Sequence, residues 1–252
     1  MKIDFHSHVK LSKKTAFDIE NFKELIKEAR EEGLTAIAIT EHFNTTNFPA
    51  VYDTLDQYYE YTNDYYDVDG FKAFTGMEVD VAEEAHVLVI GNLKDIRMLR
   101  EALNGYDTKG NFIALEKLFE LCRPYDILII GSHPFREDHP LYKAAPELLN
   151  KFHGFDLNGK DLYVYGVEEM TSMVKNLGEK HKVPVVAGSD THQYLQIGSV
   201  MTVFEKECNT VKEIKEEIGA ERYSLFISPN LRIKIKAATM IKSLLKKQLE
   251  AL

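Results

Sequence analysis

Short apolar runs alternate along this chain with longer segments in which apolar residues recur every three or four positions. The first kind of segment predicts buried strands, and the second predicts amphipathic helices. In the helix expected at 19–32, Phe22, Leu25 and Ile26 share one face, and Asp18 precedes it as a residue typical of an N-cap. The expected strands are 1–8, 34–40, 70–80, 86–91, 126–131, 162–167, 183–188 and 200–204. The expected helices are 19–32, 49–66, 93–103, 113–122, 146–152, 171–180, 210–219 and 231–252.

Strands separated by helical segments are typical of βα units and a parallel sheet. Polar residues recur where these strands end, which favours a closed α/β barrel whose site lies on that face. A doubly wound open sheet is the alternative, although it gathers ligands at one crevice rather than from many separate strands. We expect a barrel domain at 1–230 and a C-terminal basic helix at 231–252.

The terminal helix combines basic and apolar side chains. The basic residues are Arg232, Lys234, Lys236, Lys242, Lys246 and Lys247, and the apolar ones are Ile233, Ile241, Leu244, Leu245 and Leu249. Basic amphipathic helices can bind membranes or nucleic acid. The favoured interpretation is that this helix packs on its own barrel or on a partner subunit with its charges solvated.

Histidines and acids stand at the ends of the expected strands. His6 and His8 are two positions apart in the first strand, so their side chains point to the same face. The other members of the set are His42, Glu78, His86, His133, Asp190 and His192. The remaining histidines, His139, His153 and His181, follow no strand and are expected at the surface.

Imidazole and carboxylate are ligands that zinc, manganese and iron all accept. Six histidines and two carboxylates exceed what one tetrahedral ion needs, and they suit two or three divalent ions that share a carboxylate. Glu78 is the expected bridge, because it is the central acid that its strand end offers. A lone His-x-His pair is a weak signal, but its co-occurrence with the other pieces at successive strand ends predicts a metal centre.

The bulk composition limits the partners and the location. Hydrophobic residues make up 44% and charged residues 28% of the chain, as in ordinary globular proteins. The net charge of −9 argues against long nucleic acid and anionic membranes. Cys122 and Cys208 have no metal or redox spacing and indicate free thiols in a reducing compartment. No apolar run approaches the roughly 18 residues of a membrane span. We therefore expect a cytoplasmic protein without a signal peptide or membrane span.

Several short motifs together resemble the PHP (polymerase and histidinol phosphatase) domain family of metal-dependent phosphoesterases. The motifs are Asp4-Phe5-His6-Ser7-His8, Ile39-Thr40-Glu41-His42, Gly76-Met77-Glu78, His86-Val87-Leu88, Gly131-Ser132-His133-Pro134 and Gly188-Ser189-Asp190-Thr191-His192. The resemblance runs from Lys2 to about Phe204. It implies a single-domain, distorted (β/α)7 TIM-like barrel with C-terminal helices, a cluster of two or three metals, and hydrolysis of phosphate esters.

The resemblance assigns the ligands to three groups. The first is His6, His8, Glu78 and Asp190, the second is Glu78, His86 and His133, and the third is His42 and His192. The third group lacks a member, because loop 10–15 reads Lys-Leu-Ser-Lys-Lys-Thr where relatives with three metals carry another His or Asp. A lysine of that loop is an alternative contact for phosphate.

The resemblance also implies a phosphomonoesterase of the histidinol-phosphatase type that acts on a small phosphorylated substrate. Hydrolysis would proceed by in-line attack of a metal-activated hydroxide on phosphorus. His192 is expected to stabilise the leaving alkoxide, and Arg136 to clamp the phosphate through a bidentate guanidinium. A surface ion pair of Arg136 with Glu137 or Asp138 is the alternative.

Three other functions compete with this interpretation. An amidohydrolase-type barrel that cleaves a C–N bond also begins with His-x-His, but it often places a carboxylated lysine where this chain has Glu78. A PHP-type nuclease or protein phosphatase would use the same centre on a polymer. A non-catalytic metal-bound regulator is the third alternative, and a homo-oligomer is left open.

Overall fold

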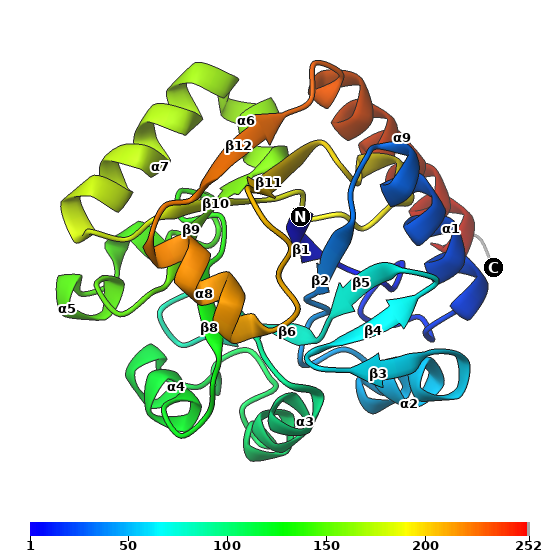
Figure 1. Cartoon of the computed structure of the whole chain (residues 1–252), viewed down its shortest axis with the longest axis horizontal. Helices are drawn as coiled ribbons and strands as arrows, with labels where there is room; N and C mark the ends of the chain where they lie inside the picture. Colours follow the sequence, from blue (N-terminus) through cyan, green and yellow to red (C-terminus); the bar gives the residue numbers. More distant parts are fainter. Residues whose placement is uncertain (251–252) are drawn as a thin grey trace.

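Two sheets form the interior of the protein, and most helices lie around them (Figure 1). The computed structural model describes the backbone of residues 1–250 and the side chains of residues 1–245. The seven-stranded sheet has the order β12 (Tyr223–Ile227), β11 (Val200–Phe204), β1 (Lys2–Ser7), β2 (Ala36–Ile39), β5 (Phe71–Phe74), β4 (Tyr65–Val68), β3 (Glu60–Thr62). The five-stranded sheet has the order β10 (Val185–Gly188), β9 (Gly154–Asn158), β8 (Leu128–Gly131), β7 (Ala85–Ile90), β6 (Gly76–Val81).

The helices separate the strands along the chain. They are α1 (Ile19–Glu31), α2 (Pro49–Tyr58), α3 (Leu93–Ala102), α4 (Leu115–Cys122), α5 (Pro146–Leu149), α6 (Gly159–Tyr165), α7 (Val167–His181), α8 (Val211–Gly219) and α9 (Leu231–Glu250). Two short 3-10 helices are η1 (Leu141–Lys143) and η2 (Tyr194–Gln196). None of the helices in the described part of the chain is both long enough and apolar enough to cross a bilayer.

The two sheets meet at both edges of the smaller one. Beyond β10, Thr191 bridges Ser7 of β1, and its carbonyl accepts a hydrogen bond from His8 N at 2.9 Å. On the other side, Glu78 of β6 bridges His42, which follows β2. These links are single bridges rather than ladders, so the described strands form two sheets and the expected seven-unit barrel is not confirmed.

Apolar side chains from both sheets pack against one another beneath these bridges. Ile3 and Phe5 of β1, Leu88 of β7, Ile130 of β8 and Val186 of β10 belong to one fully buried cluster. A larger cluster fills the space between the sheets and the surrounding helices. Together the two clusters fix the strand ends, where the polar residues lie, relative to one another.

Several sequence-based expectations for the strands were wrong. The expected strand 70–80 is two strands, β5 and β6, which belong to different sheets. The sheet is not all parallel, because β7 runs antiparallel to both β6 and β8. Segment 49–66 contains only the short helix α2, followed by strands β3 and β4, whose turn includes Asn63 at φ +52°. The segment 162–167 is helical, and the strand is β9 at Gly154–Asn158.

The error at 162–167 has a local cause. β-branched and aromatic residues there favour a strand, but the Asn158 side chain accepts a hydrogen bond from Lys160 N and starts helix α6. The true strand β9 was hidden by its polar residues Asp156 and Asn158, which are both buried. Strand β12 was not expected at all, although it pairs with β11 along its whole length.

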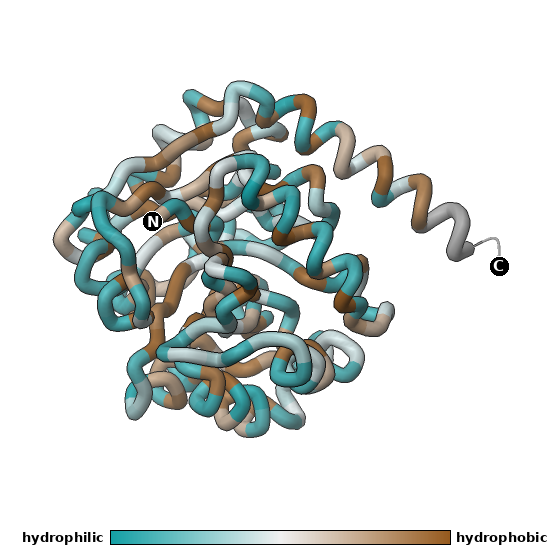
Figure 2. Tube along the Cα trace, turned by 45° about the vertical axis from the view of Figure 1, so that its right-hand side comes forward, coloured by the Kyte–Doolittle hydropathy of each residue, from teal (hydrophilic) through white to brown (hydrophobic). Residues whose placement is uncertain are grey.

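The first half of α9 packs on the body of the protein. Leu231, Ile235 and Ala238 are buried along one face, and the Lys234 ammonium lies 2.8 Å from Glu32 Oε1. Toward its C-terminal end the helix extends away from the other elements (Figure 2). Lys246, Lys247 and Leu249, which contribute to the expected amphipathic pattern, lie outside the described side chains.

Candidate metal centre

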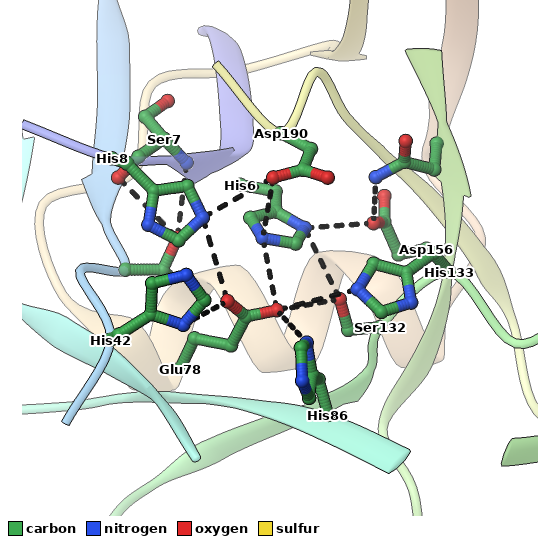
Figure 3. Close-up of polar contacts among 12 residues, drawn as sticks. His6, Ser7, His8, His42, Glu78, His86, Ser132, His133, Asp156 and Asp190 are labelled. Carbon is green, nitrogen blue, oxygen red and sulfur yellow. Dashed lines mark hydrogen bonds and ion pairs between the residues drawn. The ribbon is translucent and has the colours of Figure 1, made fainter. Parts of the chain in front are cut away.

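The carboxylate of Glu78, on β6, lies in the middle of five imidazoles (Figure 3). Its Oε1 is 3.3 Å from His6 Nε2, 3.0 Å from His86 Nδ1 and 3.4 Å from His133 Nε2. Its Oε2 is 3.5 Å from His8 Nε2 and 2.9 Å from His42 Nδ1. The two oxygens therefore face different sets of imidazoles, as a bridging carboxylate requires.

Asp190 forms the second acidic point of the cluster. Its Oδ1 lies 3.6 Å from His6 Nε2, 3.3 Å from His8 Nε2 and 3.4 Å from His192 Nδ1. Asp190 and His133 both have positive φ values, +58° and +29°. Such backbone is costly for residues other than glycine and is concentrated at functional sites.

All eight predicted ligands fall into three groups, two of which share His8. In each group, one donor atom from every member lies within 4.8 Å of the others. The groups are His6, His8 and Asp190; Glu78, His86 and His133; and His8, His42 and His192. His8 belongs to the first and the third of these groups, and a neutral imidazole binds one ion at a time.

The candidate ligand atoms fit divalent metals, because several of the buried ring nitrogens have no hydrogen-bond partner. His6 Nε2, both ring nitrogens of His8 and both of His133 have no hydrogen-bond partner in the described structure. Buried polar atoms are normally hydrogen-bonded, and each unpaired one costs free energy. Two ligands about 2.1 Å from one tetrahedral ion lie roughly 3.4 Å apart, which matches the contacts around Glu78. The donor set does not select among zinc, manganese and iron.

Residues behind the ligands fix their orientation. Asp156 Oδ2 lies 3.0 Å from His6 Nδ1 and accepts a hydrogen bond from Asn158 Nδ2 at 3.0 Å. The Glu41 carboxylate accepts hydrogen bonds from the backbone N–H groups of Lys10 and His42. Such outer carboxylates set the tautomer and the direction of metal-binding imidazoles. Asp156 was missed in the sequence because it was placed in a loop, although its neighbours Phe155 and Leu157 are the alternating apolar positions of a strand.

Burial and neighbouring charges set the protonation states of the candidate ligands. Burial alone would raise the pKa of Glu78, but His86, His42 and His6 outweigh it and hold that pKa well below its usual range. Burial keeps the pKa values of His133 and His192 well below 6.5. The Glu78 carboxyl is therefore ionised and these two imidazoles are neutral, which are the protonation states that bind metals. At His6, His8 and His86 the surrounding carboxylates outweigh burial and raise the pKa, so metal binding there would displace a proton.

Arg136 points inward rather than toward its sequence neighbours. Its guanidinium donates to Asp190 Oδ2 at 2.7 Å, to Asp161 Oδ1 at 3.0 Å and to Asn158 Oδ1 at 3.0 Å. Its side chain is only 12% exposed. The geometry makes Arg136 a residue that positions Asp190, instead of a partner of Glu137.

The three remaining histidines are not surface residues, contrary to the expectation. His139 is half-buried, and its ring centroid lies 3.9 Å from that of His86. His153 is also half-buried and accepts a hydrogen bond from Ile129 N, whereas His181 is buried beside Asn150. Lys10, in the loop from which a lysine was expected to contact phosphate, is buried. Its ammonium donates hydrogen bonds to Thr45 Oγ1 and Thr46 O, so its position does not favour a phosphate contact.

A hollow of about 380 Å³ lies beside the cluster. Its lining includes the candidate ligands His42, Glu78, His86, Asp190 and His192. This volume lies at the lower end of the range for small-molecule sites. The cluster is thus reachable by a small ligand.

The model of the PHP domain family matches residues 4–225. The chain belongs to the PHP domain family. The family that the motifs indicated is therefore confirmed, and the match covers all eight candidate ligands.

Curated relatives of PHP type include a phosphatase and a polymerase. A Clostridium botulinum (strain Okra / Type B1) protein named "Probable phosphatase" is 28% identical over 227 residues, covering 84% of this chain and 86% of that protein. The PolC-type DNA polymerase III of Thermotoga maritima is 27% identical over 153 residues, which are 60% of this chain but 10% of the polymerase. This second match spans only a small part of the longer protein.

Two solved structures share the fold. PsfC from Pseudomonas syringae PB-5123 aligns over 97% of this chain and 98% of its own, with a TM-score of 0.79 and 18% identity. The lesion-specific endonuclease Q of Pyrococcus furiosus aligns over 89% of this chain and 58% of its own, with a TM-score of 0.67 and 22% identity. At these identities the likeness concerns the fold alone.

Proposed function

We propose that this PHP protein is a metal-dependent phosphoesterase that hydrolyses small phosphomonoesters. The observation that carries the proposal is the Glu78 carboxylate shared among five imidazoles beside an open hollow. The match to a relative named as a phosphatase, over most of both chains, supports the same chemistry. We also infer that the two bridged sheets act as the distorted barrel of the family.

The residues present can hold two or three divalent ions. His6, His8, Asp190 and Glu78 would hold the first, Glu78, His86 and His133 the second, and His42 and His192 a third. A neutral His8 could serve only one of the two ions beside it. Bound there, divalent metals would stabilise negative charge on phosphate and supply hydroxide near neutral pH. Zinc, manganese and iron all suit this donor set.

The other residues of the site prepare this chemistry. Asp156 holds the His6 ring, and Arg136 holds the Asp190 carboxylate, so that both ligands keep one orientation. The depressed pKa of His192 fits a neutral ligand better than a proton donor to the leaving group. Arg136 still lines the hollow, so a contact with bound phosphate remains our prediction for its free N–H groups.

The first test is metal content together with hydrolysis of 4-nitrophenyl phosphate. We expect two or three equivalents of metal and a phosphatase activity that a chelator removes and added metal restores. Parallel assays on an amide and lactam panel and on a short oligonucleotide separate the competing hydrolases. Turnover of an amide, or of the oligonucleotide alone, would overturn the proposal, as would a folded protein that binds no metal.

A further inference from the structure

Helix α9 forms one wall of the hollow beside the metal centre. The match to the family model ends at residue 225, before this helix begins at Leu231. Ala238, Thr239 and Lys242 of α9 nevertheless line the same hollow as Glu78 and Asp190. A segment outside the family match therefore contributes side chains to the candidate site.

The helical repeat places Lys242 on the packed face of α9. Leu231, Ile235 and Ala238 are spaced by three or four residues and are buried against the body. Position 242 is the next on this stripe, because residues four apart share a helix face. A lysine stands there instead of an apolar residue, at the point where the packed surface gives way to the hollow.

A second lysine approaches the hollow from α6. Lys160 lines it together with Lys242 and Arg136. Both lysines are exposed, and neither has a carboxylate within 4.0 Å among the described side chains, whereas Arg136 is already paired with Asp161 and Asp190. Two ammonium groups without a carboxylate partner therefore face the same hollow as the candidate metal ligands.

The charges around these lysines come from every element that faces the hollow. The acids are Glu78, Asp138 and Asp190, and the cations are Arg136, Lys160 and Lys242. The side chain of Lys242 is exposed as a whole, but partial desolvation of its ammonium group at the hollow lowers its pKa; Asp190 opposes this effect, and Lys160 and Arg136 add to it. The ammonium groups thus repel one another, and an anion placed between them would relieve that repulsion.

We propose that Lys160 and Lys242 form a subsite for a second anionic group of the substrate. The preferred substrates are then small phosphomonoesters that carry another phosphate or a carboxylate. This inference rests on the proposed function, because the scissile phosphate must lie at the metal centre while the second anion lies toward the lysines. The hollow of about 380 Å³ suits a compact molecule of this kind rather than a polymer.

The experiment compares propyl phosphate with the bisphosphate esters of propane-1,3-diol, butane-1,4-diol and hexane-1,6-diol, with free metal held constant. The wild-type protein is expected to show a higher kcat/KM for at least one bisphosphate than for propyl phosphate. In K242Q and in K160Q the ratio of these kcat/KM values should fall about 10-fold, the loss of one charged hydrogen bond. K242R should retain most of the preference, since it keeps the charge.

Lys236 provides the matched control. It lies on α9, is exposed and does not line the hollow, so K236Q should keep the wild-type ratio. If wild-type protein hydrolyses propyl phosphate but shows no preference for any bisphosphate, the subsite is overturned and the proposed function stands. An equal loss of kcat/KM on propyl phosphate and on the bisphosphate in K242Q would also overturn the subsite.

If no monoester is hydrolysed, the proposed function fails and the subsite with it. Lysine-dependent cleavage of a single-stranded oligonucleotide, without an effect on bisphosphates, would assign the lysines to a nucleic-acid backbone instead.

Discussion

The imidazoles around Glu78 differ in what else they contact. His6 has Asp156 behind it, and His86 has Asp80 Oδ1 at 3.0 Å from its Nε2. His133 has no hydrogen-bond partner for either ring nitrogen in the described structure. Its position is therefore explained by packing and by the ligand role alone, which makes it the most direct residue with which to test the centre.

Replacing His133 by alanine should abolish turnover and leave the fold intact. The expected loss of kcat exceeds the roughly 10–100-fold effect that is typical for removal of an outer partner. Turnover of 4-nitrophenyl phosphate and far-UV circular dichroism measure the two properties. His181→Gln, which alters a histidine bonded to Asn150, should keep its activity. Unchanged phosphatase activity in His133→Ala would refute the assignment.

Asp156→Asn tests the support of His6. The amide keeps the size of the side chain but removes the charge that faces His6 Nδ1 at 3.0 Å. Metal affinity should fall about 10–100-fold, as for other carboxylates behind a ligating histidine. Competition with a metal-sensitive dye gives the affinity directly. An affinity equal to that of the wild-type protein would show that Asp156 serves packing only.

The hairpin of β6 and β7 explains why His86 stands at the start of its strand. The two strands are antiparallel, and Asp80 near the end of β6 pairs with His86 near the beginning of β7. The start of β7 therefore lies at the same edge as the ends of the parallel strands. An all-parallel sheet, as expected from the βα pattern, would have carried His86 to the opposite edge.

The ligand motifs could be predicted from the sequence because few residue types bind metals and the strand ends bring them together. Predicting the eight candidate ligands required correct motifs but not a correct sheet topology. Asp156 and the β3–β4 hairpin could not be found in this way. A buried carboxylate in β9 resembles a loop residue locally, and the His6 ring that it faces lies 150 residues away along the chain, in the other sheet.

His153 links β8 to the segment before β9 and should make stability depend on pH. Burial, aided by Lys215, lowers the pKa of His153 to about 4, and its Nδ1 accepts a hydrogen bond from Ile129 N. The unfolded chain titrates near 6.5. Between these values only the unfolded chain binds the proton, so stability falls as the pH drops from about 6.5 to about 4.

His153→Gln keeps an acceptor but cannot be protonated. The free energy of unfolding, measured in urea at pH 7 and at pH 4.5, should therefore decrease less in this variant than in the wild-type protein. The comparison between the two proteins removes the contribution of the other histidines. An equal decrease in both would show that His153 is protonated in the folded state.

The protein encloses a centre whose imidazole nitrogens and carboxylate oxygens can act as metal ligands. Metal binding should therefore stabilise the folded protein. At a free metal concentration 100 times the Kd, binding to the folded state contributes about 2.7 kcal/mol. For a chain of this size that corresponds to a rise in Tm of about 5–10 °C. Differential scanning calorimetry with and without a chelator measures the shift. An unchanged Tm would contradict metal binding at this centre.

The exposed apolar side chains of α9 bear on the oligomeric state, for which a homo-oligomer stays a prediction. Ile233, Met240 and Leu244 are 71%, 57% and 59% exposed. They lie away from the buried stripe through Ile235 and Ala238. Sedimentation of the full chain measures the association state without any change to the site.

The two single bridges that join the sheets have a consequence for folding kinetics. His6 comes from β1 and Asp190 from beyond β10, so bringing these ligands together closes a loop that spans most of the chain, which is slow. In the folding transition state the ligands should then not yet be assembled, so metal should not bind there and refolding rates should hardly depend on it. Unfolding should become slower when metal is bound, because the ion must leave or its ligands separate. Metal would thus prolong the lifetime of the folded state without guiding its formation.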